Sequence, residues 1–182
     1  DGTEFVPVYR HPATEQPAAV SFSPLVERIR VACESVVGYA LNHALIQLYR
    51  TGTDYISEHS DKTIDVDRAS RICNFSVGAT RTMRLRKKKE TKAMAEMAHI
   101  DDAQRIRLCN DSLLVMGLRT NRMMLHAIRR DGRRAALKAA DELAFGGERV
   151  SITFRKICTF VTRSSAPLRV DRKSTRLNPS HS

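Results

Sequence analysis

The chain has 182 residues, a net charge of +11 at neutral pH and a pI near 10.0. This length is typical of one domain and is enough to bury a sizeable core. The positive charge suggests an anionic partner, with nucleic acid as the first candidate, but says nothing about the fold. No run of about 18 apolar residues occurs, so we predict no membrane-spanning helix, and no signal peptide is visible.

The four cysteines are widely spaced and form no Cys-x-x-Cys pair: Cys33, Cys73, Cys109 and Cys158. This spacing argues against a zinc ribbon and favours reduced, buried thiols in an intracellular protein, nuclear or cytoplasmic. We expect that protein to be a monomer.

Composition divides the chain into three parts. Residues 1–22, rich in proline and polar groups, are expected to be an irregular lead-in, residues 23–163 the domain, and residues 164–182 a disordered tail. The last twelve residues, 171–182, resemble the translation of a sequencing-library adapter and are excluded from the fold. Because the chain starts at Asp1 without a methionine, we expect a fragment of a longer protein.

The domain opens with a predicted helix. Ser23 is a good N-cap and Pro24 suits the first helical position. Apolar residues then recur at helical spacing to about Val37, and Gly38 ends the helix.

After the helix the hydrophobic period changes to two. Residues 43–50 are predicted to form a strand with Leu45, Gln47 and Tyr49 on one face, followed by a turn at residues 51–53. Further on we expect strands at 71–79 and 80–86 around a corner at Gly78, and a hairpin in which 105–109 pairs with 112–117 around Asn110-Asp111. A final strand is expected from Arg149 to about Val161. Residues 87–103 and 129–147 are expected to be insertions, the second with a short Ala-rich helix. Many short strands with few helices predict an α+β chain whose core is mainly a β-sandwich or barrel.

Three residues form a candidate metal site. His59 and Asp61 are two apart, so on an extended backbone their side chains point to one face, and His126 could complete the set. Two histidines and one carboxylate on one face are diagnostic of non-haem Fe(II) oxygenases. In isolation, His59 could equally be a solvated loop residue and His126 a core histidine with its hydrogen bonds satisfied.

A candidate anion site lies in the segment RVSITFR. Arg149, Ser151, Thr153 and Arg155 share one face of a strand, and the residues between them are apolar. Two arginines on one face can each hold a carboxylate by two hydrogen bonds. The alternative is an edge strand with solvated arginines.

Two basic segments, at residues 84–92 and 129–134, could bind phosphates. The alternative is that both are solvated loops.

Together these residues resemble the AlkB family of 2-oxoglutarate/Fe(II) dioxygenases, in particular its nucleic-acid demethylase branch and a fungal-type set within it. The resemblance runs from about Leu25 to Phe160. The strings that carry it, in order, are LVERIR, LNHALIQLYRTGTDYISEHSDK, SLLVMG, LHAI and GGERVSITFRKI.

The resemblance implies a double-stranded β-helix, or jelly roll, with one preceding helix and inserted helices. It implies that His59, Asp61 and His126 hold Fe(II), with 2-oxoglutarate and O2 as co-substrates. The implied activity is oxidative demethylation of alkylated DNA or RNA bases, in which a hydroxylated methyl group leaves as formaldehyde. The base would have to be flipped out of a duplex.

The resemblance also implies a 2-oxoglutarate site. Arg155 is expected near the carboxylate at the metal end, Arg149 near the distal carboxylate, and Tyr49 as a hydrogen-bond donor. Gln47 and Ser151 each stand where the family usually has asparagine, so they keep polar function at altered reach.

The substrate side departs from the family. Thr63 stands where the demethylases have an acidic residue against the flipped base, and the nearest acid beyond it is Asp65. We expect the base-recognition lid in residues 1–22, with Tyr9 and Arg10 as its remnant. Two alternatives therefore stay open: an oxygenase of the same fold that acts on protein or a small molecule, and an inactive fragment that binds nucleic acid.

Overall fold

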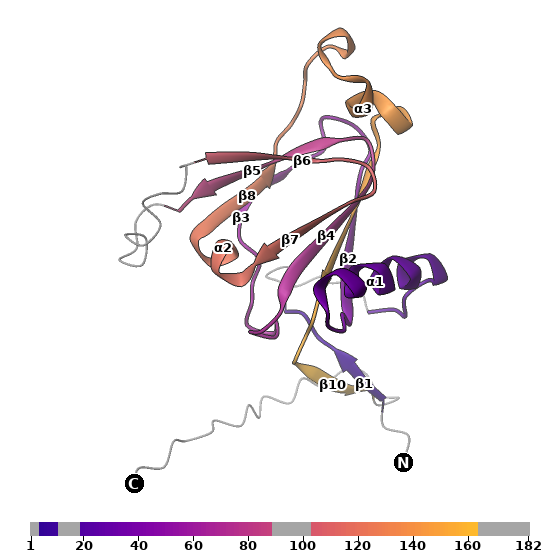
Figure 1. Ribbon diagram of the computed structural model, residues 1–182, viewed down its shortest axis with the longest axis vertical. Coiled ribbons are helices and arrows are strands. Elements are labelled where there is room, and N and C mark those ends of the chain that lie inside the picture. The colour runs from indigo at the N-terminus through magenta and orange to yellow at the C-terminus, as the bar shows by residue number, and fades with distance from the viewer. Residues whose placement is uncertain (1–3, 11–18, 89–102, 164–182) are drawn as a thin grey trace.

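The computed structural model describes residues 4–10, 19–88 and 103–163, and its core is two four-stranded antiparallel sheets (Figure 1). The first sheet has the strand order β2-β9-β4-β7 and the second has β3-β8-β5-β6. The strands of the first sheet are β2 (His43–Tyr49), β4 (Arg71–Gly78), β7 (Ser112–Gly117) and β9 (Arg149–Arg155), and those of the second are β3 (Ile56–His59), β5 (Arg81–Lys87), β6 (Ala103–Leu108) and β8 (Met124–Ile128). This is the predicted jelly roll.

Strands that are neighbours in the chain mostly lie in different sheets. Gly78, with φ 99°, turns the chain from β4 in the first sheet to β5 in the second, as predicted. The predicted hairpin around Asn110-Asp111 is wrong, although the turn is present, with Asp111 at φ 56°. β6 pairs with β5 and β7 pairs with β4, because the turn carries the chain across from one sheet to the other.

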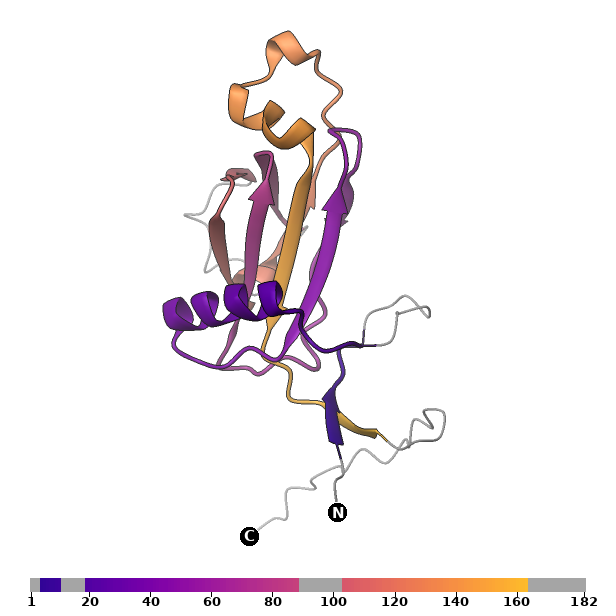
Figure 2. The same ribbon diagram turned by 90° about the vertical axis from the view of Figure 1, so that its right-hand side faces the viewer.

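Helix α1 (Pro24–Val37) covers the outer face of the first sheet (Figure 2). Ser23 caps its first turn and Gly38, with φ 81°, ends it, as the sequence predicted. Cys33 of the helix packs against Ile152 and Phe154, which lie on the face of β9 that points away from the second sheet. The apolar residues of β9 are therefore buried under α1, and its polar residues face the second sheet.

Large apolar side chains from both sheets fill part of the space between them. Two buried clusters lie there, made of Ile72, Leu85, Met116, Met123 and Met124 in one, and of Tyr49, Met83, Leu108 and Ile128 in the other. Arg81, which is also buried, donates hydrogen bonds to the backbone carbonyls of Thr51, Gly52, Asp54 and Arg129 and so ties two loops together at one end of the sheets.

Several elements differ from their predicted bounds. The final strand stops at Arg155, and a separate strand β10 (Phe160–Arg163) pairs with β1 (Glu4–Pro7), so part of the lead-in is regular structure. A helix that was not predicted, α2 (Leu118–Met123), precedes β8, and the predicted Ala-rich helix is three short turns, η2 (Ala135–Leu137), α3 (Ala140–Leu143) and η3 (Ala144–Gly147). The predicted tail and most of the 87–103 insertion lie outside the described residues.

All four cysteines are free thiols, as expected. Cys33 and Cys73 are buried, but Cys109 and Cys158 are exposed, so the prediction of burial was right for two of them. Within the described part of the chain, no helix has the length and apolar character needed to cross a membrane.

We predict that Gly78→Ala destabilises the fold much more than Gly38→Ala. Both glycines have positive φ, but a Cβ at Gly78 would lie 2.3 Å from the backbone oxygen of Glu148, whereas nothing lies within 4 Å of one at Gly38. We expect the free energy of unfolding to fall by about 1 kcal/mol for Gly38→Ala and by about 3 kcal/mol or more for Gly78→Ala, measured by denaturant titration. Equal losses would contradict the close approach at this corner.

Candidate metal centre and co-substrate cavity

The two candidate histidines lie opposite each other on adjacent strands of the second sheet. β3 and β8 pair antiparallel with His59 opposite His126, and their ring centroids are 4.2 Å apart. Asp61 lies two residues beyond His59, after the end of β3. Its Oδ1 lies 3.7 Å from His59 Nε2 and 3.6 Å from His126 Nε2. The three predicted ligands therefore converge, and we call them the metal triad.

The metal triad fits a bound cation. One donor atom from each residue lies within 4.8 Å of the other two, and the nitrogen–oxygen separations exceed hydrogen-bond lengths. His59 Nδ1 lies 2.7 Å from the carbonyl oxygen of Ser57, which favours a proton on Nδ1 and leaves Nε2 free to bind metal. His126 is buried with no hydrogen-bond partner for Nδ1, so it is not a core histidine with its bonds satisfied.

The charges around the triad suit metal ligation. Burial raises the pKa of the Asp61 carboxyl, but the charge and hydrogen bonds of Arg155, together with the nearby His126 and His59, outweigh burial, so this pKa lies below its ordinary value. Burial, and then the nearby His59, lowers the pKa of His126 to about 4. At neutral pH the site thus presents an ionised carboxylate and a neutral buried imidazole, the protonation states that bind a divalent cation.

Two residues hold Asp61 in place. Arg155 donates to its Oδ2 from Nη2 at 2.5 Å and from Nε at 3.2 Å, leaving Oδ1 facing the histidines. Asn121 of α2 forms a reciprocal pair with the Asp61 backbone, donating to its carbonyl oxygen and accepting from its amide, both at 2.9 Å. The carboxylate is therefore oriented at both its side chain and its main chain.

A cavity opens between the sheets directly behind the triad, and we call it the inner cavity. It is lined by all eight predicted site residues, Gln47, Tyr49, His59, Asp61, His126, Arg149, Ser151 and Arg155. Strand β9 lies inside the first sheet between β2 and β4, so the alternative of an edge strand with solvated arginines is wrong. Arg149 and Arg155 are buried, with 1% and 2% of their surface exposed.

Arg149 lies in the inner cavity with unused hydrogen-bonding capacity. Its Nη2 donates to Ser76 Oγ at 2.9 Å and to Asn74 Oδ1 at 3.2 Å, while Nε and Nη1 are buried without a partner. Burial lowers its pKa to about 10. An unpaired buried guanidinium is costly, so this edge of Arg149 fits an anionic ligand such as a carboxylate.

Sequence reasoning missed Asn74 and Asn121. Asn74 of β4 donates to Ser151 Oγ and Thr153 Oγ1, both at 2.8 Å, and accepts from Arg149, so it places an amide beside the serine that replaces the usual asparagine. Asparagine is uncommon inside strands, and its presence in RICNFSVG was the available signal. Nothing local distinguishes Asn121, because its partner is 60 residues away in the chain.

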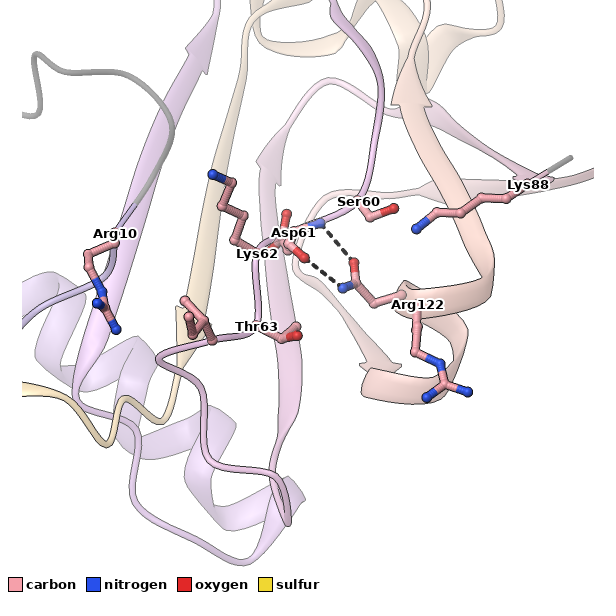
Figure 3. A pocket seen from close by; sticks show the side chains of 9 residues that line it. Arg10, Ser60, Asp61, Lys62, Thr63, Lys88 and Arg122 are labelled. Carbon is pink, nitrogen blue, oxygen red and sulfur yellow. Dashed lines mark hydrogen bonds between the residues drawn. The ribbon is translucent and has the colours of Figure 1, made fainter. Parts of the chain in front are cut away.

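A second pocket lies on the outer side of the triad and shares Asp61 with the inner cavity. Arg10, Ser60, Lys62, Thr63, Ile64, Lys88, Asn121 and Arg122 line the rest of this outer pocket, whose volume is about 510 Å³ (Figure 3). Arg10 is paired with the buried Asp65, which also accepts from Thr159. Asp65 is therefore an anchor for the N-terminal segment, and Thr63 is the residue at the predicted base-contact position that reaches the pocket.

Comparison with protein-family models now identifies this arrangement. Residues 3–155 match the model of the 2OG-Fe(II) oxygenase superfamily. The chain belongs to that superfamily. Its cofactors are accordingly Fe(II), 2-oxoglutarate and O2, and the side chains around the triad and the inner cavity fit the metal and the co-substrate.

Individual relatives carry AlkB-type names. The chain is 32% identical over 134 residues to human DNA oxidative demethylase ALKBH2 and 30% identical over 142 residues to the bovine protein, covering 74% and 78% of this chain. It is 30% identical over 93 residues, 51% of this chain, to human alpha-ketoglutarate-dependent dioxygenase alkB homolog 3. The matches span 46% of each ALKBH2 protein and 32% of the homolog 3 protein, so the chain corresponds to about half or less of these relatives.

We predict that His43 makes the fold sensitive to acid. His43 of β2 has a buried, unpartnered Nδ1, and burial together with the charge of Arg155 lowers its pKa to about 4. Its pKa is below that of an unfolded histidine, so the unfolded state binds the proton first and stability falls as pH drops from about 6.5 to 4. In His43→Phe, which preserves the ring beside Tyr9, the His43 share of this loss, at most about 3 kcal/mol, should be absent from unfolding curves measured across that range, while the share of His126 remains. Parallel pH profiles for the two proteins would contradict this assignment.

Proposed function

We propose that this chain is the catalytic core of an Fe(II)/2-oxoglutarate dioxygenase that oxidatively demethylates alkylated nucleic-acid bases. One observation carries the proposal: the metal triad lies between an inner cavity with a buried, unsatisfied arginine and an outer pocket rich in basic side chains. A co-substrate can thus reach the metal from one side and an anionic macromolecule from the other.

In this proposal His59, Asp61 and His126 hold the iron. Arg149 takes the distal carboxylate of 2-oxoglutarate on its unpartnered Nε and Nη1, with Tyr49 beside it, where the tyrosine ring lies 5.3 Å from the guanidinium carbon. Arg155 keeps Asp61 ionised and oriented and lies at the metal end of the cavity. Gln47 and Ser151 line the same cavity as polar neighbours of the co-substrate.

The bound iron and 2-oxoglutarate supply the oxidising chemistry, and the protein supplies orientation and a dry site. When bound, they would supply the oxidation of a C–H bond of the substrate methyl group to a hydroxymethyl group, with 2-oxoglutarate and O2 converted to succinate and CO2. The hydroxymethyl group would then lose its O–H proton as the C–N bond breaks with both electrons going to the base nitrogen. Formaldehyde would leave, and the nitrogen would end with a lone pair or take up the proton.

Three observations support nucleic acid as the macromolecular substrate. The net charge is +11, basic side chains surround the outer pocket, and the relatives at about 30% identity are named DNA oxidative demethylases. The basic segments contribute less than their charges suggest, because Arg86 pairs with Glu58, and Arg133 pairs with Asp131 and Glu142. We place the protein inside the cell, in the nucleus or cytoplasm, as a monomer.

One observation favours a second candidate. Thr63 offers no charge to a substrate base, so an oxygenase of the same superfamily that acts on a protein or a small molecule would fit the outer pocket too. The two candidates differ in what stimulates succinate formation from 2-oxoglutarate: methylated oligonucleotides for the first, and a protein or small molecule for the second.

We predict that His59→Ala abolishes formaldehyde release from methylated oligonucleotides. Losing one of three protein ligands should weaken iron binding and lower kcat/KM by at least about 100-fold. Arg28→Gln, an exposed substitution on α1, is the control and should leave turnover unchanged. If the wild-type protein converts 2-oxoglutarate but releases no formaldehyde from any methylated oligonucleotide, the demethylase proposal is wrong.

A second prediction concerns Arg149→Met. Without ligand, this variant should be as stable as the wild type or more so, within about 2 kcal/mol, because an unpaired buried charge is removed. With a divalent metal present throughout, adding 2-oxoglutarate should raise the Tm of the wild type and leave that of the variant unchanged. A full ligand-induced shift in the variant would contradict the role given to Arg149.

A further inference from the structure

The outer pocket has an uneven balance of charge. Among the described residues that line it, four are basic, Arg10, Lys62, Lys88 and Arg122, and one is acidic, Asp61. Figure 3 shows Arg10 on one side and Lys88 and Arg122 on the other, with Asp61, Lys62 and Thr63 between them. A ligand in this pocket is therefore surrounded by cations.

The negative charges near the pocket are already engaged. Asp61 is directed to the triad histidines through Oδ1 and to Arg155 through Oδ2. Asp65 is buried and neutralised by Arg10. Within residues 4–10, 19–88 and 103–163, by contrast, no carboxylate pairs with Lys62, Lys88 or Arg122, so in this part of the chain three positive charges at the pocket lack an acidic partner.

From this charge balance we infer that the outer pocket selects methylated bases that are uncharged over those that carry a positive charge. The inference rests on the proposed demethylase function and names the substrate class within it. Methylation at N3 of cytosine or N1 of adenine adds a group to a bare lone pair and produces a cation at neutral pH. Methylation at N3 of thymine or N1 of guanine replaces a proton, so the base stays neutral.

Electrostatics decides between these two classes. A cationic base in the pocket would meet three like charges at partly exposed positions, and each such pair typically changes the binding free energy by a few tenths of a kcal/mol, which amounts to about tenfold together. Neutral bases avoid this repulsion, and Thr63 offers them a hydroxyl that can donate or accept a hydrogen bond.

The test compares two single-stranded oligonucleotides of one sequence that carry either 3-methylthymine or 3-methylcytosine at the same position. We expect kcat/KM for formaldehyde release to be about tenfold higher with 3-methylthymine at low salt. The preference should shrink as salt is raised, because screening weakens the repulsion, while the shared phosphate contribution cancels in the ratio. Affinities from fluorescence anisotropy, without turnover, should show the same ratio.

Two variants move the preference in a direction that loss of fold would not. Thr63→Asp adds a carboxylate of similar size and should shift the ratio towards 3-methylcytosine by about tenfold. The triple substitution Lys62→Gln, Lys88→Gln and Arg122→Gln should shift it the same way. Arg28→Gln removes one charge from the far helix α1 and should leave the ratio unchanged.

A wild-type preference for 3-methylcytosine, or a ratio that neither salt nor the triple variant changes, would overturn the inference while leaving the proposed function intact. If neither oligonucleotide releases formaldehyde although 2-oxoglutarate is still converted to succinate, the proposed function fails and the inference fails with it.

Discussion

The site depends on the interactions of the Asp61 carboxylate. One of its oxygens faces two imidazoles and the other accepts two hydrogen bonds from Arg155, so a residue just beyond β3 joins the second sheet to β9 of the first. The backbone of Asp61 is held in addition by Asn121 of α2. Because each partner comes from a different element, the ligand geometry is a property of the assembled jelly roll and of no single segment.

The site contains buried polar groups without hydrogen-bond partners, which a bound ligand would satisfy. Arg149 is buried with two nitrogens lacking partners, and His126 has a buried Nδ1 without one. Such groups lower the stability of the free protein, and an anion or a cation that bound to them would raise it again. Both residues line the inner cavity, one from each sheet. The groups that destabilise the free protein are therefore the groups proposed to bind its ligands.

Much of the fold was predictable from local patterns. The cap at Ser23, the stop at Gly38 and the alternation in 43–50 and 149–155 gave correct elements, because capping and side-chain alternation act over a few residues. Two of the wrong predictions share one cause. The turn at Asn110-Asp111 is the same locally whether it closes a hairpin or crosses between sheets, and the end of β9 at Arg155 depends on β10 finding β1 as its partner.

By itself the sequence picked out the candidate site residues: His59, Asp61 and His126 by type and order, and the two arginines by their shared strand face. Only the tertiary structure decided that His59 and His126 are opposite each other in neighbouring strands. It also decided that Asn74 and Asn121 support the site, and that the carboxylate of Asp65 is paired with Arg10. The physical reason is that local pattern specifies which way a side chain points on its own element, whereas contacts between residues 55 or more positions apart are set by how the two sheets pair and pack.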